Sequence, residues 1–359
     1  MAVISLDQLK AGMILADDVY IFNNKLLLPK GTELSDYMIN KLGFYAIKSV
    51  KVCDETSSND NTTKKEPAEQ SYAQRLRQSA EFKAFKEEYF KNVYQFKTDF
   101  LEIANNNEKI DPDAFVNKIS SILDSCKGVS VFDMLHCMRD YDDATFVHSL
   151  NTALICNVFG GWLSMSKEDI DVLTLAALLH DIGKIRVPDS ITKKTGVLTE
   201  TERTLMQAHT VYGFEILKNQ DIDERIRLTA LMHHEKYDGT GYPKKLKGEQ
   251  IEDFAKIVGI ASEYDSLTSS RSYRQAKCPF EVIKRFELEG LQRYDTRFIL
   301  TFLEHISNSF INNTVQLSDG RKGEIVMINR QFLSRPIVKC GTEFVDLSKK
   351  TSISIEAII

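Results

Sequence analysis

The spacing of hydrophobic residues is helical through most of the chain, from Ser71 to about Ser307. Apolar side chains recur there at steps of three and four residues, which places them on one face of a helix. The clearest stripe consists of Phe82, Phe85, Tyr89, Val93 and Phe96. Asp111 followed by Pro112 is typical of the start of another helix. The sequence therefore predicts a mainly α fold whose helices bury these faces against one another.

The first 52 residues predict a small α/β module. Short apolar runs flank Asn23-Asn24, which is a hairpin signal. A short helix is expected at residues 35–43, where a serine begins it and a glycine ends it. Tyr45–Val52 then alternates as a strand. Residues 53–70 are polar and lack aromatic side chains, so we expect a linker there.

After about Phe310 the apolar period changes from helical steps to two, which is typical of strands. Strands are predicted at Thr314–Leu317, Glu324–Ile328 and Pro336–Cys340, with a turn at Ser318-Asp319-Gly320 between the first two. The predicted order is therefore the α/β module at 1–52, the linker at 53–70, a helical bundle at 71–309 and a β-rich tail at 310–359.

The composition excludes several classes of function. The formal net charge is −5, so we expect no binding to polymeric nucleic acid, and a phosphate-bearing ligand needs a local cationic site. The N-terminal residues lack the basic and apolar regions of a signal peptide, and no apolar run approaches the roughly 18 residues of a membrane span. The six cysteines include no C-x-x-C pair, so reduced thiols are expected. These features predict a cytoplasmic protein.

Five of the seven histidines fall between residues 148 and 234. A lone histidine on a helix is more often an ordinary hydrogen-bonded residue than a ligand, and His136 and His305 are interpreted in that way. The other five lie on separate predicted helices that can converge inside a bundle. With one carboxylate they form the candidate metal ligands His148, His180, Asp181, His209, His233 and His234. Imidazole and carboxylate suit Fe, Mn, Co or Zn, and the lack of cysteine among them argues against a structural zinc site.

Asp181 is the natural bridge between two cations, because a carboxylate has two oxygens and Asp181 has candidate ligands on both sides. Two divalent ions about 4 Å apart can share a hydroxide and clamp the oxygens of an in-line phosphoryl displacement. One aspartate offsets only about one of the roughly four positive charges that two such ions bring. The remaining positive field favours a phosphodiester substrate.

Two further segments are candidate contacts to a phosphate ligand. His233-His234 runs directly into a loop that contains Gly241, Tyr242 and Pro243. Alone this loop reads as an ordinary turn, but beside the ligands it predicts a rim that offers N–H groups and the Tyr242 hydroxyl. Arg271 and Arg274 are three residues apart and suit phosphate oxygens and guanine edges. A solvated surface pair is the alternative for these arginines.

Together these motifs resemble the HD-GYP family, the branch of HD-domain phosphohydrolases that degrades cyclic di-GMP. The motifs are His148-Ser149, His180-Asp181-Ile182-Gly183-Lys184, His209, His233-His234-Glu235 with Asp238-Gly239-Thr240-Gly241-Tyr242-Pro243, and Arg271 with Arg274. The resemblance covers about residues 71–310. It implies a helical core that holds two or three metal ions, often iron or manganese, on the six candidate ligands. It also implies that Lys184 lies near the scissile phosphate and that Tyr242 and the two arginines contact the dinucleotide.

The sequence departs from the family pattern at two positions. Ala144 stands where members with three metals carry a glutamate, which leaves two ions as the expectation. Ser262 stands where the family usually has the first aspartate of Asp-x-x-Asp, a metal ligand. Serine is a poor ligand, and Glu263 would point about 100° away on a helix. Asp265 lies one turn from Ser262 and is expected to reach the metal, directly or through water, or to orient Lys184.

Three functions remain open at this point. The favoured one is hydrolysis of cyclic di-GMP to pGpG, or further to GMP, by a hydroxide shared between two metal ions, with Asp181, Lys184 and Asp265 as catalytic residues. The second is a signalling module that binds cyclic di-GMP with weak or no turnover, which the replacement at Ser262 motivates. The third is hydrolysis of another nucleotide. A homodimer is possible through the helical region after the linker.

Overall fold

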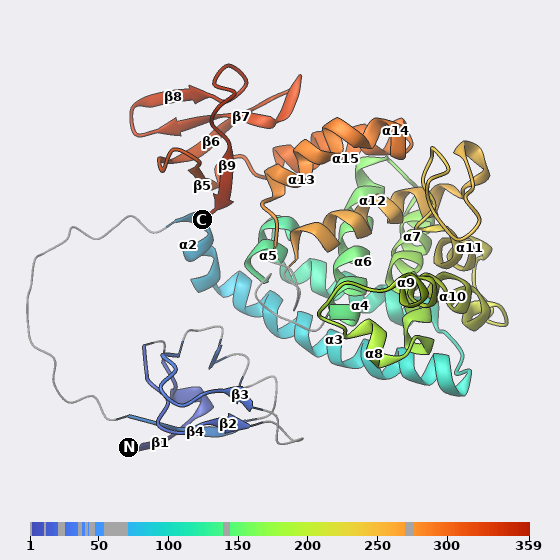
Figure 1. The fold of residues 1–359 in the computed structure, drawn as a ribbon, viewed down its shortest axis with the longest axis horizontal. Coiled ribbons are helices and arrows are strands. Elements are labelled where there is room, and N and C mark those ends of the chain that lie inside the picture. Colours follow the sequence, from blue (N-terminus) through green and yellow to red (C-terminus); the bar gives the residue numbers. More distant parts are fainter. Residues whose placement is uncertain are drawn as a thin grey trace, which may run out of the picture. The chain divides into compact units, whose positions relative to one another are not determined.

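The chain divides into two compact units, Met1–Glu69 and Gln70–Ile359, which are considered one at a time (Figure 1). The structure is a computed structural model, and it describes residues 2–10, 12–20, 26–34, 38–39, 42, 47–53, 71–138, 144–269 and 276–359.

The first unit contains two small antiparallel sheets with an apolar core of their own. One sheet pairs β1 (Ala2–Ser5) with β4 (Ser49–Val52), the other pairs β2 (Val19–Tyr20) with β3 (Leu26–Leu28), and a 3-10 turn η1 (Leu6–Gln8) follows β1. The core consists of Leu9, Leu15, Val19, Leu28, Leu34, Leu42, Val50 and Val52. The antiparallel pairing of β2 with β3 agrees with the predicted hairpin, although Asn23-Asn24 lies outside the described residues. The predicted linker beyond Cys53 and most of the predicted helix at 35–43 also lie outside them.

The second unit is mainly helical, which confirms the predicted fold class. Its helices are α2 (Tyr72–Gln78), α3 (Ala80–Asn106), α4 (Pro112–Ser125), α5 (Val131–Met138), α6 (Ala144–Trp162), α7 (Lys167–Leu179), α8 (Asp189–Thr192), α9 (Glu200–Gln207), α10 (His209–Leu217), α11 (Glu224–Met232), α12 (Asp253–Thr268), α13 (Pro279–Arg285), α14 (Leu291–Arg293) and α15 (Thr296–Asn308). Shorter turns are the 3-10 segments η2 (Ile182–Arg186) and η3 (Gly248–Gln250) and the π-type segment η4 (Phe286–Gly290).

The residues that predicted helices α3 and α4 have the expected positions in them. The aromatic stripe lies on the buried face of α3, where Phe85, Tyr89 and Phe96 are almost inaccessible to solvent. Asp111 caps α4, because its Oδ1 accepts a hydrogen bond from the backbone N–H of Ala114 at 3.1 Å. Burial of such faces, and not helix propensity alone, stabilises these helices in the folded chain.

The helices α6, α7, α10, α11 and α12 form the part of the bundle that carries the candidate site. α6 packs against α7 and α12, and α11 packs against α7, α10 and α12 (Figure 1). α3 runs alongside and contacts α6. The second half of α7, from Leu173 to Leu179, is buried on every side. Its C-terminal end therefore delivers the next residues into the interior of the bundle.

The tail is one five-stranded antiparallel sheet. It contains β5 (Thr314–Leu317), β6 (Lys322–Asn329), β7 (Phe332–Cys340), β8 (Glu343–Asp346) and β9 (Ile355–Ile358), in the order β8-β7-β6-β5-β9. The three predicted strands and the turn at 318–320 are present, and Gly320 has the positive φ of 86° that such a turn favours. β8 and β9 escaped prediction because four residues are too few for a clear period of two. The sheet contributes Val315, Val338 and other side chains to the same apolar core as the helices.

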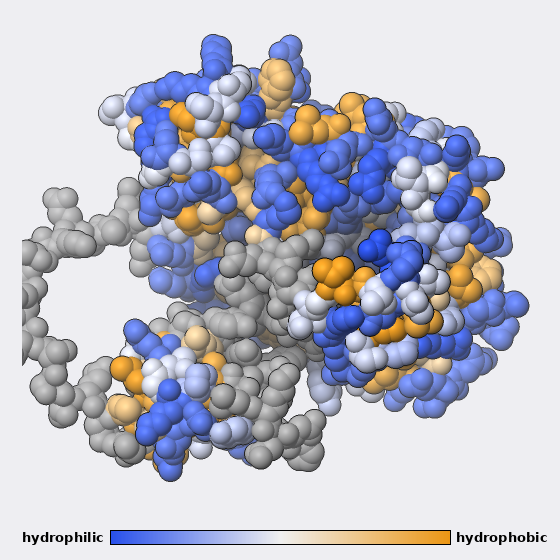
Figure 2. Space-filling view, in the orientation of Figure 1, coloured by the Kyte–Doolittle hydropathy of each residue, from blue (hydrophilic) through white to orange (hydrophobic). Residues whose placement is uncertain are grey.

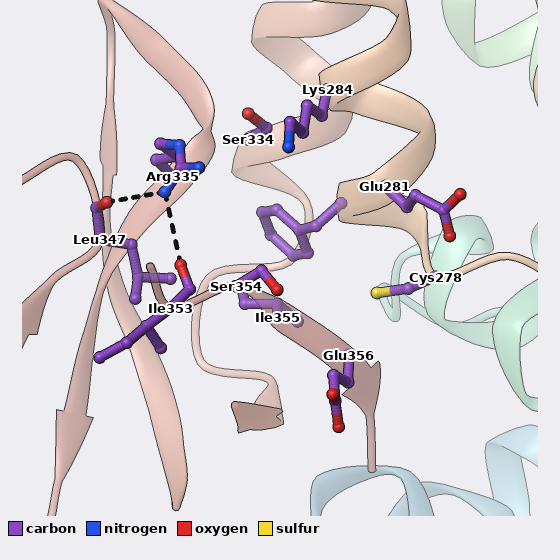
Figure 3. Close-up of a pocket in the computed structure, with 11 residues that line it drawn as sticks. Cys278, Glu281, Lys284, Ser334, Arg335, Leu347, Ile353, Ser354, Ile355 and Glu356 are labelled. Atoms are coloured by element: carbon purple, nitrogen blue, oxygen red, sulfur yellow. Dashed lines mark hydrogen bonds between the residues drawn. The ribbon is translucent and has the colours of Figure 1, made fainter. Parts of the chain in front are cut away.

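α13 and the sheet enclose a cavity of about 350 Å³ (Figure 3). Arg335 of β7 lies beside it and donates hydrogen bonds to the carbonyl oxygens of Leu347 at 3.1 Å and Ile353 at 3.4 Å. These bonds satisfy carbonyl groups of the segment between β8 and β9, which runs without regular structure. The guanidinium therefore holds that segment against the sheet.

The visible face of the larger unit is mostly hydrophilic, with hydrophobic residues in small separate patches (Figure 2). Among the described helices, none combines the length and the apolar character that crossing a bilayer demands. No disulfide joins any two of the six cysteines, all of which lie in described residues.

Candidate metal centre

Asp181 lies at the centre of the candidate site, directly after the buried end of α7. Its side chain is 1% exposed. Burial alone would raise the pKa of this carboxyl group, but Lys184 and His180 outweigh that effect and hold the pKa well below its usual range. Asp181 is therefore ionised inside the bundle, where a lone charge needs partners.

The histidine rings divide into two sets on the two oxygens of Asp181. Nε2 of His180 lies 3.4 Å from Oδ2, and Nε2 of His148, from α6, lies 3.7 Å from the same oxygen. Nε2 of His209, from α10, lies 3.3 Å from Oδ1, and Nε2 of His233, after α11, lies 3.6 Å from it. One carboxylate thus faces imidazoles from four different parts of the chain.

Among the residues that the structure describes, two groups of side chains have the spacing of metal ligands, and Asp181 belongs to both. One group is His148, His180 and Asp181, and the other is Asp181, His209, His233 and His234. Within each group the potential ligand atoms lie within 4.8 Å of one another. All six residues predicted as ligands are therefore brought together, and the shared carboxylate has the position that a bridge between two cations requires.

Backbone carbonyl groups orient three of the rings. Nδ1 of His180 lies 2.6 Å from the Ala177 oxygen, and Nδ1 of His209 lies 2.6 Å from the Met206 oxygen. Nδ1 of His233 lies 3.1 Å from the Thr229 oxygen. A carbonyl can only accept, so Nδ1 carries the proton in each ring and the Nε2 lone pair faces the centre.

The atoms at the centre suit a cation. With the Nδ1 positions protonated, Nε2 of His209 and Nε2 of His233 are both acceptors, yet they lie 3.4 Å apart. Nε2 of His180 and Oδ1 of Asp181 are buried, and no hydrogen-bond donor among the described residues reaches them. Lone pairs that converge without donors are costly to bury, and a divalent cation satisfies them. The donor set therefore fits the metal that the histidines predicted.

Burial also keeps the imidazoles in the form that binds metal. It lowers the pKa of His180 and of His234 well below the usual value, and it lowers the pKa of His233 as well. Neutral rings do not have to lose a proton before they coordinate a cation. Nitrogen and oxygen donors without thiolate are suited to Fe, Mn, Co or Zn.

Lys184 lies on η2, one turn beyond Asp181, and its ammonium group pairs with Asp181 Oδ2. Its side chain is 18% exposed, whereas the carboxylate is buried. Lys184 therefore lies at the solvent side of the centre, where its charge can meet an incoming anion.

Ser262 and Asp265 of α12 both contact His148. The Asp265 carboxylate accepts a hydrogen bond from His148 Nδ1 at 2.7 Å. Ser262 Oγ lies 3.1 Å from Nε2 of the same ring. The serine hydroxyl therefore uses the lone pair that a cation would take. The expectation that Asp265 orients Lys184 has no support in these contacts, because Asp265 meets His148 and the lysine meets Asp181.

Glu263 points away from the centre, as the helical geometry predicted. It accepts a hydrogen bond from Lys236 Nζ at 2.8 Å and another from the Tyr294 hydroxyl. These contacts of the partly buried Glu263 tie α12 to the loop that follows His234.

The predicted rim loop folds over the second set of histidines. The Glu235 carboxylate accepts hydrogen bonds from the backbone of Lys244 at 2.6 Å and of Leu246 at 3.0 Å, which closes the loop on itself. A Cβ at Gly241 would lie 2.4 Å from the Lys236 nitrogen, so only glycine allows this approach. Tyr242 stacks on His234 with ring centroids 4.6 Å apart.

Three predicted substrate contacts have different outcomes. Pro243 follows Tyr242 through a cis peptide bond in the same rim loop. Arg271 and Arg274 lie outside the described residues, so their role stays a prediction.

Residues 138–298 match the family model described as HD domain. The chain contains an HD domain. This match confirms the resemblance that the histidine and aspartate motifs predicted, and it covers every candidate ligand.

Relatives of the HD domain are named as phosphodiesterases. The chain is 45% identical over 141 residues to the cyclic di-GMP phosphodiesterase response regulator RpfG of Xanthomonas campestris, covering 38% of this chain and 36% of the relative. It is 34% identical over 177 residues to a cyclic di-GMP phosphodiesterase of Thermotoga maritima, covering 48% of each. It is 30% identical over 177 residues to the 3'3'-cGAMP-specific phosphodiesterase 2 of Vibrio cholerae, covering 49% of this chain and 34% of the relative. The matched segment spans between a third and a half of these relatives.

An HDG"Y"P protein of Bdellovibrio bacteriovorus matches in structure with a TM-score of 0.43 at 16% identity, over 85% of this chain and 99% of that one.

The sequence analysis did not identify two polar residues near the candidate ligands, Asn151 and Tyr89. Asn151 lies one helical turn after His148, a spacing that could have indicated a shared face. Tyr89 is in α3, outside the matched segment, and looked like one more member of the aromatic stripe. No local signal distinguishes its hydroxyl from the neighbouring phenyl rings.

Proposed function

We propose that this protein is a metal-dependent phosphodiesterase that hydrolyses a cyclic dinucleotide, with cyclic di-GMP as the favoured substrate. The observation that carries the proposal is the division of the imidazoles between the two oxygens of one buried carboxylate, Asp181. A shared carboxylate with nitrogen donors on each side is the arrangement of two-metal phosphoryl-transfer sites.

Two divalent ions, iron or manganese, would be held by this donor set. His148, His180 and Asp181 would hold one, and Asp181 with His209, His233 and His234 would hold the other. Such ions supply Lewis acidity to a phosphodiester and lower the pKa of water. The protein's own part is to fix the rings through their Nδ1 bonds and to keep Asp181 ionised.

The residues around the centre have roles that follow from their contacts. Lys184 is partly exposed and would neutralise charge that develops on the phosphate oxygens. Burial raises the pKa of Tyr242, so its hydroxyl stays protonated and can donate to the ligand. Gly241 and Pro243 hold that ring in the rim. Arg271 and Arg274 remain predicted contacts to the phosphates or the guanine edges.

The choice of substrate is supported by the relatives. Two of them are named for cyclic di-GMP and one for 3'3'-cGAMP. These ligands share two phosphodiester bonds and differ in one base, so the metal centre would treat them alike. The expected product of cyclic di-GMP is pGpG, or GMP after a second cleavage.

Ser262 favours a second candidate, a signalling module that binds the cyclic dinucleotide with little turnover. The hydroxyl meets Nε2 of His148 at 3.1 Å and adds no charge to that half of the centre. The ion held by His148 would therefore bind more weakly than its neighbour. A weakly held ion lowers the fraction of chains that are competent for hydrolysis.

The test uses the full chain with added Mn²⁺ or Fe²⁺. Bound metal per chain is measured, and cyclic di-GMP and 3'3'-cGAMP are followed separately by chromatography. Asp181→Asn is expected to lose both metal and turnover. The control Asp171→Asn removes a carboxylate from α7, the helix that precedes Asp181. Asp171 pairs there with Lys167 at 2.9 Å, and this variant should behave as the wild type.

Each result decides between the candidates. Turnover in the wild type that disappears in Asp181→Asn supports the enzyme. Binding of cyclic di-GMP without turnover, unchanged by Asp181→Asn, would refute it in favour of the binding module. Faster turnover of 3'3'-cGAMP than of cyclic di-GMP would overturn the assigned substrate and keep the reaction.

A further inference from the structure

A continuous chain of buried hydrogen bonds connects α3 to the candidate metal centre. The Tyr89 hydroxyl donates to Asn151 Oδ1 at 2.6 Å. The amide of Asn151 donates to Asp265 Oδ1 at 2.9 Å. The other oxygen of Asp265 accepts from His148 Nδ1 at 2.7 Å. Three helices thus contribute to the orientation of one ring.

The direction of the donors is consistent along the whole chain. Asn151 can donate only through its amide nitrogen, and its oxygen is occupied by the tyrosine hydroxyl, so its orientation is determined. Asp265 receives hydrogen bonds at both oxygens, including one from Ser269 at 3.1 Å. The proton of His148 is thereby placed on Nδ1, so that Nε2 is an acceptor on the side of Asp181 and Ser262.

These hydrogen bonds are buried, so water cannot replace a partner that is lost. Tyr89, Asn151, Asp265 and His148 are each at most 7% exposed. A polar group at such a position that loses its partner has no water to replace it. Loss of the Tyr89 hydroxyl is therefore expected to alter the orientation of the Asn151 and Asp265 side chains.

We propose that Tyr89 and Asn151 are positioning residues for the His148 half of the metal centre. The inference rests on the proposed function in one respect, that the centre holds metal ions. The hydroxyl of Tyr89 acts through Asn151 and Asp265 on His148, and it does not reach the second set of histidines. Because Tyr89 lies outside residues 138–298, the HD domain depends on a helix that precedes it.

The test measures metal affinity in addition to activity. The metal-free full chain is titrated with Co²⁺, and the two binding steps are assigned with His148→Ala and His209→Ala. Tyr89→Phe keeps the ring that packs in the core and removes only the hydroxyl. We expect the affinity of the His148 step to fall roughly 5- to 10-fold, because partners behind a ligand histidine commonly affect affinity on this scale. The other step should change less than about two-fold.

Matched variants separate positioning from a general loss of packing. Tyr72→Phe is the control, because the Tyr72 hydroxyl also donates to a carboxylate, that of Asp133 at 3.0 Å, whose other oxygen accepts from Asn313 and not from a ligand histidine. Asn151→Ala breaks the same chain at its second member and should lower the same binding step. In an Asp265→Ala background, Tyr89→Phe should have no further effect on that step.

Two results would overturn the inference. One is a Tyr89→Phe titration that matches Tyr72→Phe, and the other is an equal fall in both binding steps. The proposed function fails separately, if the wild type binds both ions and hydrolyses no cyclic dinucleotide. In that case a selective fall at the His148 step still supports the positioning role.

Discussion

Replacement of Gly183 by alanine tests the contact that brings His209 to the centre. Gly183 is in η2, which packs against α10. A Cβ at Gly183 would lie 2.0 Å from the backbone oxygen of His209 and 2.3 Å from the backbone nitrogen of Gly213. Both atoms belong to the main chain, so no side-chain rotation relieves the overlap. The two segments must separate.

The size of the effect follows from these distances. Carbon and oxygen need at least about 3 Å, so η2 and α10 have to move apart by about 1 Å. Overpacking of a core costs about 1–3 kcal/mol and occasionally more, and a clash with backbone belongs at the upper end. At about 3 kcal/mol the melting temperature should fall by roughly 6 °C or more. His209 moves with α10, so its Nε2 leaves the position 3.3 Å from Asp181 Oδ1.

The assay compares Gly183→Ala with Gly161→Ala. Gly161 is exposed near the end of α6, where an added Cβ has nothing within 4 Å, and alanine there should be neutral or stabilise by up to about 1 kcal/mol. Melting of the metal-free chains measures the packing cost, and bound metal per chain measures the displacement of His209. The reasoning is wrong if Gly183→Ala melts within about 1 °C of the wild type and binds the same amount of metal.

Three other changes have expected outcomes. Ser262→Asp should raise the metal affinity of the step that involves His148 by about 10-fold or more, measured by titration, because a carboxylate adds charge beside Nε2. Glu263→Gln leaves the buried Lys236 without its counter-charge and should cost about 3 kcal/mol at pH 7, measured by urea unfolding. Burial raises the pKa of Glu263, but Lys236 outweighs it and holds the pKa below the usual 4.5. The wild type therefore loses this stabilisation as the pH falls from about 4.5 through the pKa of the folded state. The stability of the variant should fall less steeply over the same pH range. Tyr242→Phe should raise KM for the cyclic dinucleotide about 5-fold with bound metal unchanged, measured by steady-state kinetics.

The candidate ligands could be predicted because their chemistry is visible in the residue types. Five histidines and Asp181 on separate helical segments indicate nitrogen and oxygen donors without thiolate. Helices and most strands of the tail could be predicted because periods of 3.6 and 2 are local properties of the chain. The strands β8 and β9 could not, because four residues carry too little of a period.

The partner of Asp265 shows the limit of that reasoning. Its spacing from Ser262 placed it one turn along α12, on the side of the metal, and this much is a property of any helix. Whether the Asp265 carboxylate contacts Lys184, a metal ion or an imidazole depends on how α12 packs against α6. The crossing brings it to His148, 117 residues earlier in the chain.

From the sequence alone come the helices, the donor types and the single carboxylate that faces ligands from both directions. Tertiary structure decides that His148 and His180 take one oxygen of Asp181 while His209 and His233 take the other. It also decides that the Tyr89 hydroxyl, 62 residues before Asn151, supports the first of these pairs. Local patterns determine which face of a helix is buried, but the angle and height at which two helices pack depend on side chains from both, and these contacts decide which atoms meet.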